Sequence, residues 1–216
     1  MATILLTGFE PFGGEQTNPS WQAVSRLGGQ PLRDGSRVHV AQLPCAFGSS
    51  MALLDQLIAR VQPEIVVCVG QAGGRSEISV ERVAINIDDA RIPDNAGAQP
   101  IDCAIAVGGP AAYFSTLPIK AIVQRLNENG IPAAISQTAG TYVCNHVFYG
   151  LMHAQKRHPS VQRAGFVHIP YLPEQAVAQA GAPSMSLELM VRGLLMLLET
   201  TQATGIDSRI SGGATH

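Results

Sequence analysis

Cys144 is the residue best placed to do chemistry, because it stands where an expected strand-end loop becomes a helix. Residues 131–135 form a short apolar run typical of a buried strand, and Val147, Phe148 and Leu151 follow at helical spacing. The first N–H groups of a helix have no partner within it, and its dipole presents partial positive charge there. This environment favours the thiolate, the nucleophilic form of cysteine. Cys144 is therefore a candidate catalytic nucleophile.

A nucleophilic cysteine needs a base within hydrogen-bond reach, and His168 is the best candidate among the six histidines. His168 lies near the end of a predicted strand, residues 164–169, and Pro170 then turns the chain out of the sheet. Active sites of open α/β sheets gather at carboxyl strand ends, and Cys144 also follows such an end. His146 is excluded, because side chains two positions apart on a helix do not face each other. The alternative interpretation of His168 is a satisfied structural histidine.

The base in turn needs an orienting acceptor, and Glu81 lies on a predicted strand that spans residues 76–88. Alternation puts Glu81 on the same face as the apolar side chains of Ile85 and Ile87. A carboxylate on an apolar face is costly to bury unless it is paired, and an imidazolium would serve as the partner. An exposed edge with Glu81 beside Arg82 remains the alternative.

Two other chemistries fit the sequence less well. The glycine-rich segment 70–74 follows a strand, but it is not GxGxxG, and the chain contains no P-loop motif. A zinc site built from Cys144, His146 and His153 fails geometrically, because positions seven apart on a helix are separated by about 10.5 Å along the axis. We therefore expect no metal ligands in this region.

The composition excludes several classes of partner. The 216 residues include only 14% charged residues, and the net charge of −2 comes without a basic cluster, which argues against nucleic acid and anionic membranes. The N-terminus lacks the pattern of a signal peptide, and no apolar run is long enough to span a bilayer, so we expect a cytoplasmic protein. Cys45, Cys68 and Cys103 are expected to be free thiols that fill the core. So few charges also favour burial of surface between subunits.

Strand-like and helix-like segments alternate along the chain, which predicts an α/β sandwich with a mostly parallel sheet. The expected strands are residues 2–7, 37–43, 64–70, 76–88, 131–135 and 164–169. The expected helices begin after Ser20, which resembles an N-cap, at Ser49, at Pro118, near Cys144 and at Ser186. We expect one domain over residues 1–200 and a disordered tail over residues 201–216.

Four segments, in chain order, resemble the signatures of pyroglutamyl-peptidase I (pyrrolidone-carboxylate peptidase), a family of cysteine peptidases. They are the N-terminal motif LTGFEPFGG with NPS, the glutamate segment that includes ISVERVAIN, the cysteine segment IPAAISQTAGTYVCNHVFY, and the histidine segment FVHIPYLP. Together they reach from near the N-terminus to about residue 175, and four such matches are far more specific than a guessed triad.

The resemblance implies a cytosolic thiol exopeptidase that removes N-terminal pyroglutamate from peptides, with a three-layer α/β/α fold and no cofactor. It also implies a homotetramer. By motif position, Cys144 is the nucleophile, His168 the base and Glu81 the third member of the triad. The family's substrate pocket uses aromatic residues of the opening loop, which fall here on Phe9 and Phe12.

Pyroglutamate is a neutral lactam, so an apolar slot with a few hydrogen bonds would suffice to bind it. Phe9 and Phe12 could clamp the ring, although both could equally anchor the loop to the core. Gln71 and Tyr142 complete the expected substrate-binding residues, together with Arg91, for which a surface salt bridge is the alternative. Two other functions stay open: a phosphate-dependent enzyme similar to nucleoside phosphorylases, and a protein that binds pyroglutamyl N-termini without cleaving them.

Overall fold

The computed structural model describes residues 1–213 and contains a six-stranded sheet with the strand order β2-β1-β3-β8-β4-β7. These strands are β1 (Thr3–Phe9), β2 (Arg37–Leu43), β3 (Ile65–Gln71), β4 (Ile78–Glu81), β7 (Ala133–Ser136) and β8 (Arg163–Ile169). Neighbours pair in parallel except β4 and β8, which run antiparallel. The sheet is therefore mixed but mostly parallel, as the sequence predicts.

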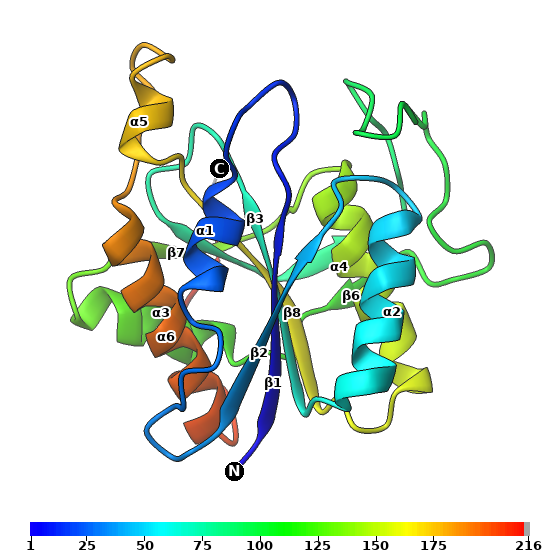
Figure 1. Cartoon of the computed structure of the whole chain (residues 1–216). Coiled ribbons are helices and arrows are strands. Elements are labelled where there is room, and N and C mark those ends of the chain that lie inside the picture. The colour runs from blue at the N-terminus through cyan, green and yellow to red at the C-terminus, as the bar shows by residue number, and fades with distance from the viewer. Residues whose placement is uncertain (214–216) are drawn as a thin grey trace.

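Helices cover both faces of this sheet (Figure 1). One face carries α1 (Pro19–Ser25), α3 (Ile119–Glu128) and α6 (Leu187–Ala203), and the other carries α2 (Ser49–Val61) and α4 (Val143–Ala154). A 3₁₀ turn (Gln155–Arg157) extends α4, and the short α5 (Pro173–Ala176) follows β8. The expected three-layer α/β/α arrangement is confirmed.

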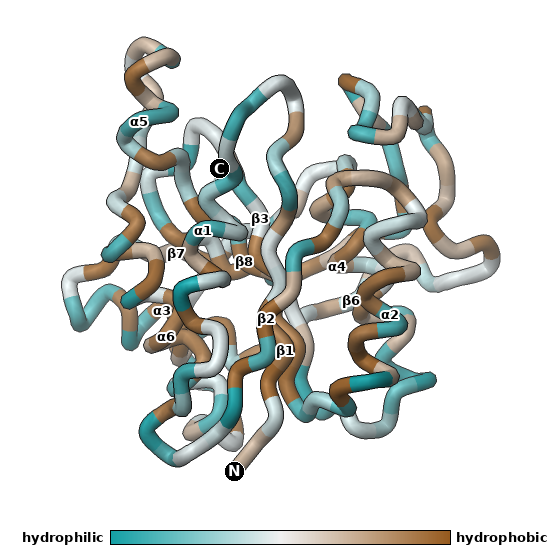
Figure 2. The backbone as a smooth tube through the Cα atoms, in the orientation of Figure 1, coloured by the Kyte–Doolittle hydropathy of each residue, from teal (hydrophilic) through white to brown (hydrophobic). Residues whose placement is uncertain are grey.

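The apolar core is divided by the sheet into two layers, one under each set of helices (Figure 2). Strand β1 supplies both layers in alternation: Ile4 and Leu6 pack under α1, whereas Leu5 and Phe9 pack on the side of α2 and α4. Strand β3 is buried along its whole length, because it lies between two parallel neighbours with helices on both sides.

The predicted strand over residues 76–88 is wrong as a single element. Its first half is β4, whereas its second half is β5 (Val83–Ile85), which pairs with β6 (Ala112–Phe114) in a separate two-stranded sheet. Arg82 lies at the transition, where its N–H donates to the Ser136 carbonyl and its own carbonyl accepts from the Ser115 N–H. The chain passes there from one sheet to the other, and the alternation of apolar residues changes phase at the same point.

The predicted N-cap Ser20 differs in detail, and part of the predicted tail contacts α3. The N-cap of α1 is Asn18, whose side chain accepts from the Ser20 N–H, while the Ser20 hydroxyl accepts from the Phe9 N–H and so ties the opening loop to the helix. The segment expected to be a disordered tail is described as far as residue 213, and Asp207 in it accepts from the Lys120 and Ala121 N–H groups at the start of α3. Residues 214–216 of that predicted tail lie outside the described residues.

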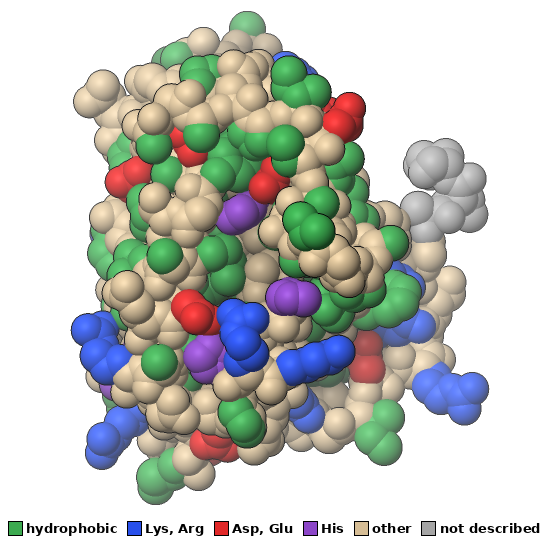
Figure 3. Space-filling model, turned by 90° about the vertical axis from the view of Figure 1, so that its right-hand side faces the viewer, with side chains coloured by type: hydrophobic (Ala, Val, Ile, Leu, Met, Phe, Trp, Pro, Cys, Tyr) green, Lys and Arg blue, Asp and Glu red, His purple; other side chains and the backbone are tan. Residues whose placement is uncertain are grey.

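The surface over α2 and α4 is unevenly charged. Most of the Lys and Arg side chains visible on this side lie in its lower half (Figure 3), away from the end of the sheet where β1, β3 and β8 terminate. Within residues 1–213, no helix is long and apolar enough to cross a bilayer.

Candidate active site

The thiol of Cys144 lies over Gly70, next to the strand that carries His168. In the parallel pairing of β3 and β8, Gly70 is the register partner of His168. A Cβ atom added to Gly70 would stand 2.9 Å from the Cys144 Sγ and 2.9 Å from the Phe166 ring. The missing side chain of Gly70 thus leaves the space that the Cys144 thiol fills. Cys144 and His168, which the sequence predicts to converge, are thus both neighbours of Gly70.

Cys144 is the second residue of α4, as the sequence predicts. Gly140 takes a positive φ of 77° in the preceding loop, Tyr142 is extended at the N-cap, and the His146 N–H closes the first turn on the Tyr142 carbonyl. Among the described residues, no side chain caps this helix end. The N–H groups of the first turn are therefore available beside the thiol, where they can donate to an anionic oxygen.

Glu81 holds the imidazole of His168 from the neighbouring antiparallel strand. The Nδ1 of His168 lies 2.7 Å from the Glu81 Oε1, with Glu81 0% and His168 4% exposed. The two residues are diagonal neighbours, since Ser79 and not Glu81 is the register partner of His168. A proton on Nδ1 satisfies the carboxylate and leaves Nε2 as an acceptor, the arrangement that a general base needs.

Burial dominates the electrostatics of the thiol and the imidazole. It raises the pKa of Cys144 well above its ordinary value, and nearby Cys45 and Glu81 raise this pKa further. Burial also lowers the pKa of His168, outweighing the hydrogen bond with Glu81, which raises it. Both groups are therefore neutral at pH 7. This differs from the expectation of a thiolate, because burial disfavours the charged form of the thiol.

Arg75 is a charged neighbour of these residues that sequence reasoning missed. Its Nη1 donates to the Glu81 Oε1 at 2.7 Å, and its Nη2 donates to the Thr138 carbonyl at 3.1 Å. In the sequence, Arg75 is visible only as a charged residue six positions before Glu81, in the loop after β3. Nothing in the spacing showed that the loop would fold back over the carboxylate.

His146 and Asn145 face away from the reacting groups and hold α4 in place. The His146 Nε2 accepts from the Gly48 N–H at 3.0 Å, and its Nδ1 lies 2.8 Å from the Asp88 Oδ2. Asn145, fully buried, accepts from the Ile85 N–H and donates to two carbonyls of the β5 segment. The exclusion of His146 as the base for Cys144 agrees with these contacts.

Three half-buried aromatic rings form a cluster between the opening loop and the start of α4. Tyr142 contacts Phe12 at a centroid distance of 6.1 Å and Phe47 at 5.5 Å, and its hydroxyl donates to the Pro93 carbonyl. Phe47 was not predicted. Phe9 is only 2% exposed and packs on Phe166, which favours the alternative that it anchors the loop to the core.

Gln71 and Arg91, the two polar residues expected at the pocket, lie in different surroundings. Gln71 ends β3, is 9% exposed, and its Oε1 accepts from the amide of Gln175, a residue of α5, at 3.1 Å. Arg91 has an exposed side chain, and the ion pairs found within residues 1–213 do not include it, so the alternative interpretation of a surface salt bridge is not supported there.

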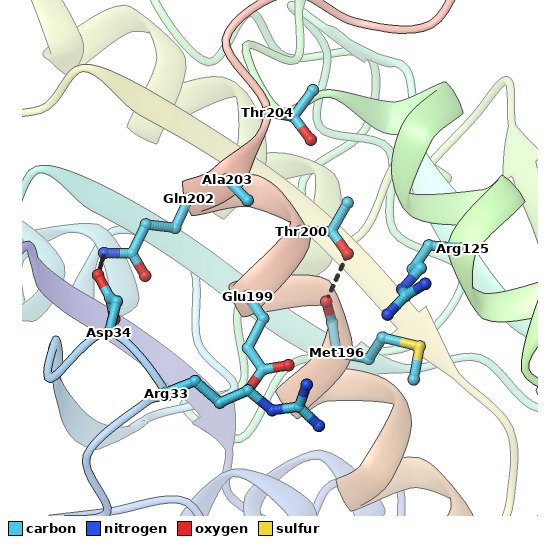
Figure 4. Close-up of a pocket in the computed structure, with 9 residues that line it drawn as sticks. All are labelled: Arg33, Asp34, Arg125, Met196, Glu199, Thr200, Gln202, Ala203 and Thr204. Atoms are coloured by element: carbon cyan, nitrogen blue, oxygen red, sulfur yellow. Dashed lines mark hydrogen bonds and ion pairs between the residues drawn. The ribbon is translucent and has the colours of Figure 1, made fainter.

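A cavity of about 550 Å³ lies elsewhere, at the C-terminal end of α6 (Figure 4). An ion pair between Arg33 and Glu199 at 3.3 Å closes part of it, and Arg125 and Met196 contribute further side chains. None of the candidate catalytic or substrate-binding residues lines this cavity. It is therefore separate from the group formed by Cys144 and His168.

A cysteine at a helix start, beside a histidine that is held by a buried glutamate on an α/β/α sheet, is typical of cysteine hydrolases. The family model described as pyroglutamyl peptidase, peptidase family C15, matches residues 2–204. The chain therefore belongs to the pyroglutamyl peptidase family.

Relatives with known names match along their whole length. The chain is 61% identical over 219 residues to the pyrrolidone-carboxylate peptidase of Cupriavidus pinatubonensis and 57% identical over 216 residues to pyrrolidone-carboxylate peptidase 1 of Ralstonia nicotianae, with 100% of each chain covered. The crystal structure of pyroglutamyl peptidase I from Bacillus amyloliquefaciens superposes with a TM-score of 0.94 at 51% identity, covering 97% of this chain and 99% of that one.

Proposed function

We propose that this chain hydrolyses the bond after an N-terminal pyroglutamyl residue, with Cys144 as nucleophile, His168 as base and Glu81 as its orienting acceptor. The observation that carries the proposal is the 2.7 Å hydrogen bond between His168 and Glu81. His168 lies next to Gly70 in the sheet, and the Cys144 thiol lies over Gly70. Membership of the pyroglutamyl peptidase family supplies the substrate class.

The reaction starts from a neutral thiol and a neutral imidazole. As the Cys144 Sγ attacks the pyroglutamyl carbonyl carbon, the His168 Nε2 takes the thiol proton. The tetrahedral oxyanion collapses, the peptide C–N bond breaks, and His168 gives that proton to the leaving amine. A water molecule then attacks the thioester while His168 accepts one of its protons. Collapse releases pyroglutamate, and His168 returns the proton to the Cys144 thiolate.

The first turn of α4 supplies the oxyanion site in this mechanism. Its free N–H groups donate to the developing charge, and the loss of one such donor typically costs about 100 to 1000-fold in rate. Glu81 stabilises the imidazolium that forms when His168 takes the proton. The buried surroundings of His168 and Glu81 strengthen the interaction between these two groups.

We assign lactam binding to the aromatic cluster of Phe12, Phe47 and Tyr142. A pyroglutamyl ring has no ammonium group, so its recognition requires no carboxylate, and flat rings suit it. Gln71 and Arg91 stay proposed substrate contacts. Phe9 is better placed to support the pocket from the core than to touch the ring.

Release of aminocoumarin from a pyroglutamyl conjugate tests the proposal, with the alanyl conjugate as the specificity control. We expect only the pyroglutamyl conjugate to be hydrolysed, iodoacetamide to abolish the reaction, and Cys144→Ser to lower kcat/KM by about 1000-fold or more. Cys103→Ser, which changes an exposed thiol, is the matched control and should keep full activity.

Hydrolysis retained in Cys144→Ser would contradict the thiol mechanism. No hydrolysis by folded, reduced wild-type protein would remove the peptidase function. A phosphate-dependent transferase or a protein that only binds pyroglutamyl N-termini would then be favoured.

We also propose that the protein acts in the cytoplasm as a homotetramer. Four free cysteines support a reducing compartment. The exposed apolar side chains of Ile101, Val107 and Phe114 are candidates for burial between subunits. Light scattering should give four times the chain mass of 22.8 kDa, and a monomeric mass would contradict the assembly.

A further inference from the structure

Arg75 forms an ion pair with the buried carboxylate of Glu81, and the proposed mechanism does not use this contact. Its guanidinium reaches from the loop between β3 and β4 to Glu81, which is fully buried, while Arg75 itself is 29% exposed. The same Glu81 oxygen, Oε1, also receives the hydrogen bond from His168. One carboxylate oxygen is thus shared by a fixed cation and by the imidazole.

Among the described residues, the negative charge of the buried Glu81 carboxylate is compensated only by Arg75, because His168 is neutral. Burying a carboxylate costs several kcal/mol unless a cation compensates it, and a neutral imidazole provides one hydrogen bond but no charge. The second oxygen of Glu81, Oε2, is buried and has no hydrogen-bond partner within residues 1–213. Arg75 is therefore the cation that compensates the buried Glu81 carboxylate next to His168.

The second contact of Arg75 connects this pair to the nucleophile. Its Nη2 donates to the Thr138 carbonyl, and Thr138 lies in the loop that leads from β7 through Gly140 into α4. The carboxylate that orients the base and the loop that places the thiol are thus held by one side chain. A guanidinium suits this task because its nitrogens point in fixed, diverging directions.

We propose that Arg75 is a positioning residue of the active site: its guanidinium compensates Glu81 and ties the Glu81–His168 pair to the loop that enters the Cys144 helix. The inference rests on the proposed function, because it assigns Arg75 a role toward those three residues. A role in fold stability alone is the competing interpretation.

The two interpretations differ in what they predict for titration of the site. The groups that face the imidazole and the thiol are Glu81 from β4, Arg75 from the loop before β4, Cys68 from β3, and Cys45 from the segment after β2. Among them Arg75 alone lowers the pKa of both His168 and Cys144. Removing its charge should raise both pKa values, whereas a residue that only stabilises the fold would leave them unchanged.

The test compares Arg75→Met with wild type by kcat/KM from about pH 5 to pH 10, with pyroglutamyl-aminocoumarin as the substrate. We expect a loss of about tenfold or more at neutral pH and an acid limb moved to higher pH. Arg82→Met is the matched control, because it removes the same charge at the position next to Glu81. The Arg82 side chain donates to the Gly212 carbonyl. An unchanged pH profile, with activity lost only in proportion to folded protein, would overturn the proposal.

Arg75→Lys is a second test variant that keeps the positive charge. It also replaces Arg75→Met as the test if that variant does not fold. We expect the acid limb of wild type with a lower kcat, because one ammonium cannot hold Glu81 and Thr138 at the same time. A wild-type kcat in Arg75→Lys would contradict the tether to Thr138.

A readout independent of turnover separates this inference from the proposed function. The rate of Cys144 alkylation by iodoacetamide, followed by peptide mass across pH, should have a higher midpoint in Arg75→Met than in wild type. A shifted midpoint supports the role of Arg75 even if no peptidase activity is found. An unshifted midpoint contradicts it even if the peptidase activity is present.

Discussion

Gly70 sets the tightest steric limit around the candidate nucleophile. It is buried in β3, directly beside His168 in the sheet, and its missing side chain is the space over which the Cys144 thiol lies. Any side chain at this position must displace either the thiol or the Phe166 ring, at 2.9 Å from each. The position of the thiol relative to the imidazole therefore depends on a residue that has no chemistry of its own.

Gly70→Ala should lower kcat/KM by about 100-fold, because a misplacement of the thiol by about 1 Å can cost that much. Overpacking of this kind also typically costs about 1–3 kcal/mol of stability. Steady-state kinetics and urea unfolding measure the two effects. Gly205→Ala is the matched control, since a Cβ there meets nothing within 4 Å. Wild-type kcat/KM in Gly70→Ala would show that the thiol has room to move.

The three candidate catalytic residues could be predicted from the sequence, whereas their electrostatic surroundings could not. Strand ends and a helix start are local patterns, so Cys144 and His168 follow from their neighbours in the chain. The protonation of Cys144 depends on how much of the protein encloses it, and the contact of Arg75 with Glu81 depends on a folded-back loop. Both arise from tertiary structure that spacing does not encode.

At the scale of elements, the first turn of α4 is fixed to its surroundings by side chains that lie next to Cys144. Asn145 bonds three backbone groups of the segment that contains β5, and His146 joins Asp88 to the loop before α2. These contacts hold the helix end at which the proposed oxyanion site lies. The second, two-stranded sheet therefore supports the active site although it contributes no catalytic residue to it.

Asn145→Ala should destabilise the protein by about 3 kcal/mol or more, because it leaves buried backbone groups of the β5 segment without partners. The free energy of unfolding in urea measures this loss. Asn129→Ala, which removes one exposed hydrogen bond to the Arg125 carbonyl, should change stability by less than about 0.5 kcal/mol. Equal effects of the two substitutions would mean that the β5 segment rearranges to satisfy its own backbone.

The break between β4 and β5 shows why the elements were only partly predictable. Each half alternates between apolar and polar residues, but the apolar positions change phase at Arg82, from Ile78 and Val80 before it to Val83 and Ile85 after it, and the prediction of one continuous strand did not take this shift into account. The halves separate because their partners differ: β4 pairs with β7 and β8, whereas β5 pairs with β6, a strand of 3 residues that is too short to be noticed. Partner choice is set by the whole fold.

For the whole molecule, the buried titratable groups limit the pH range of stability at both ends. His168 has a lowered pKa, so the unfolded chain binds more protons below about pH 6.5, and stability falls as the pH falls through that window. Burial raises the pKa of Cys45 and Cys68 to about 12 each, so the unfolded chain loses protons first above about pH 9. Stability is therefore highest between these limits.

Between about pH 9 and pH 12, each of these thiols should reduce the free energy of unfolding by about 1.4 kcal/mol per pH unit. Urea unfolding at a series of pH values measures the slope. Cys68→Ala should make the slope shallower, although it also costs packing at neutral pH, whereas Cys103→Ala, at an exposed position, should leave the slope unchanged. The same slope in all three proteins would show that the buried thiols do not cause the alkaline loss.

The place of β8 in the sheet has a consequence for how the protein is made. It is the last strand to be synthesised, yet it lies between β3 and β4 in the middle of the sheet. A growing chain can pair β1, β2 and β3, and can pair β4 with β7, but the two groups stay separate until residues 163–169 have left the ribosome. Until then the strand edges of β3 and β4 are open to other chains. The same late segment carries His168, so closure of the sheet and completion of the candidate active site are one event.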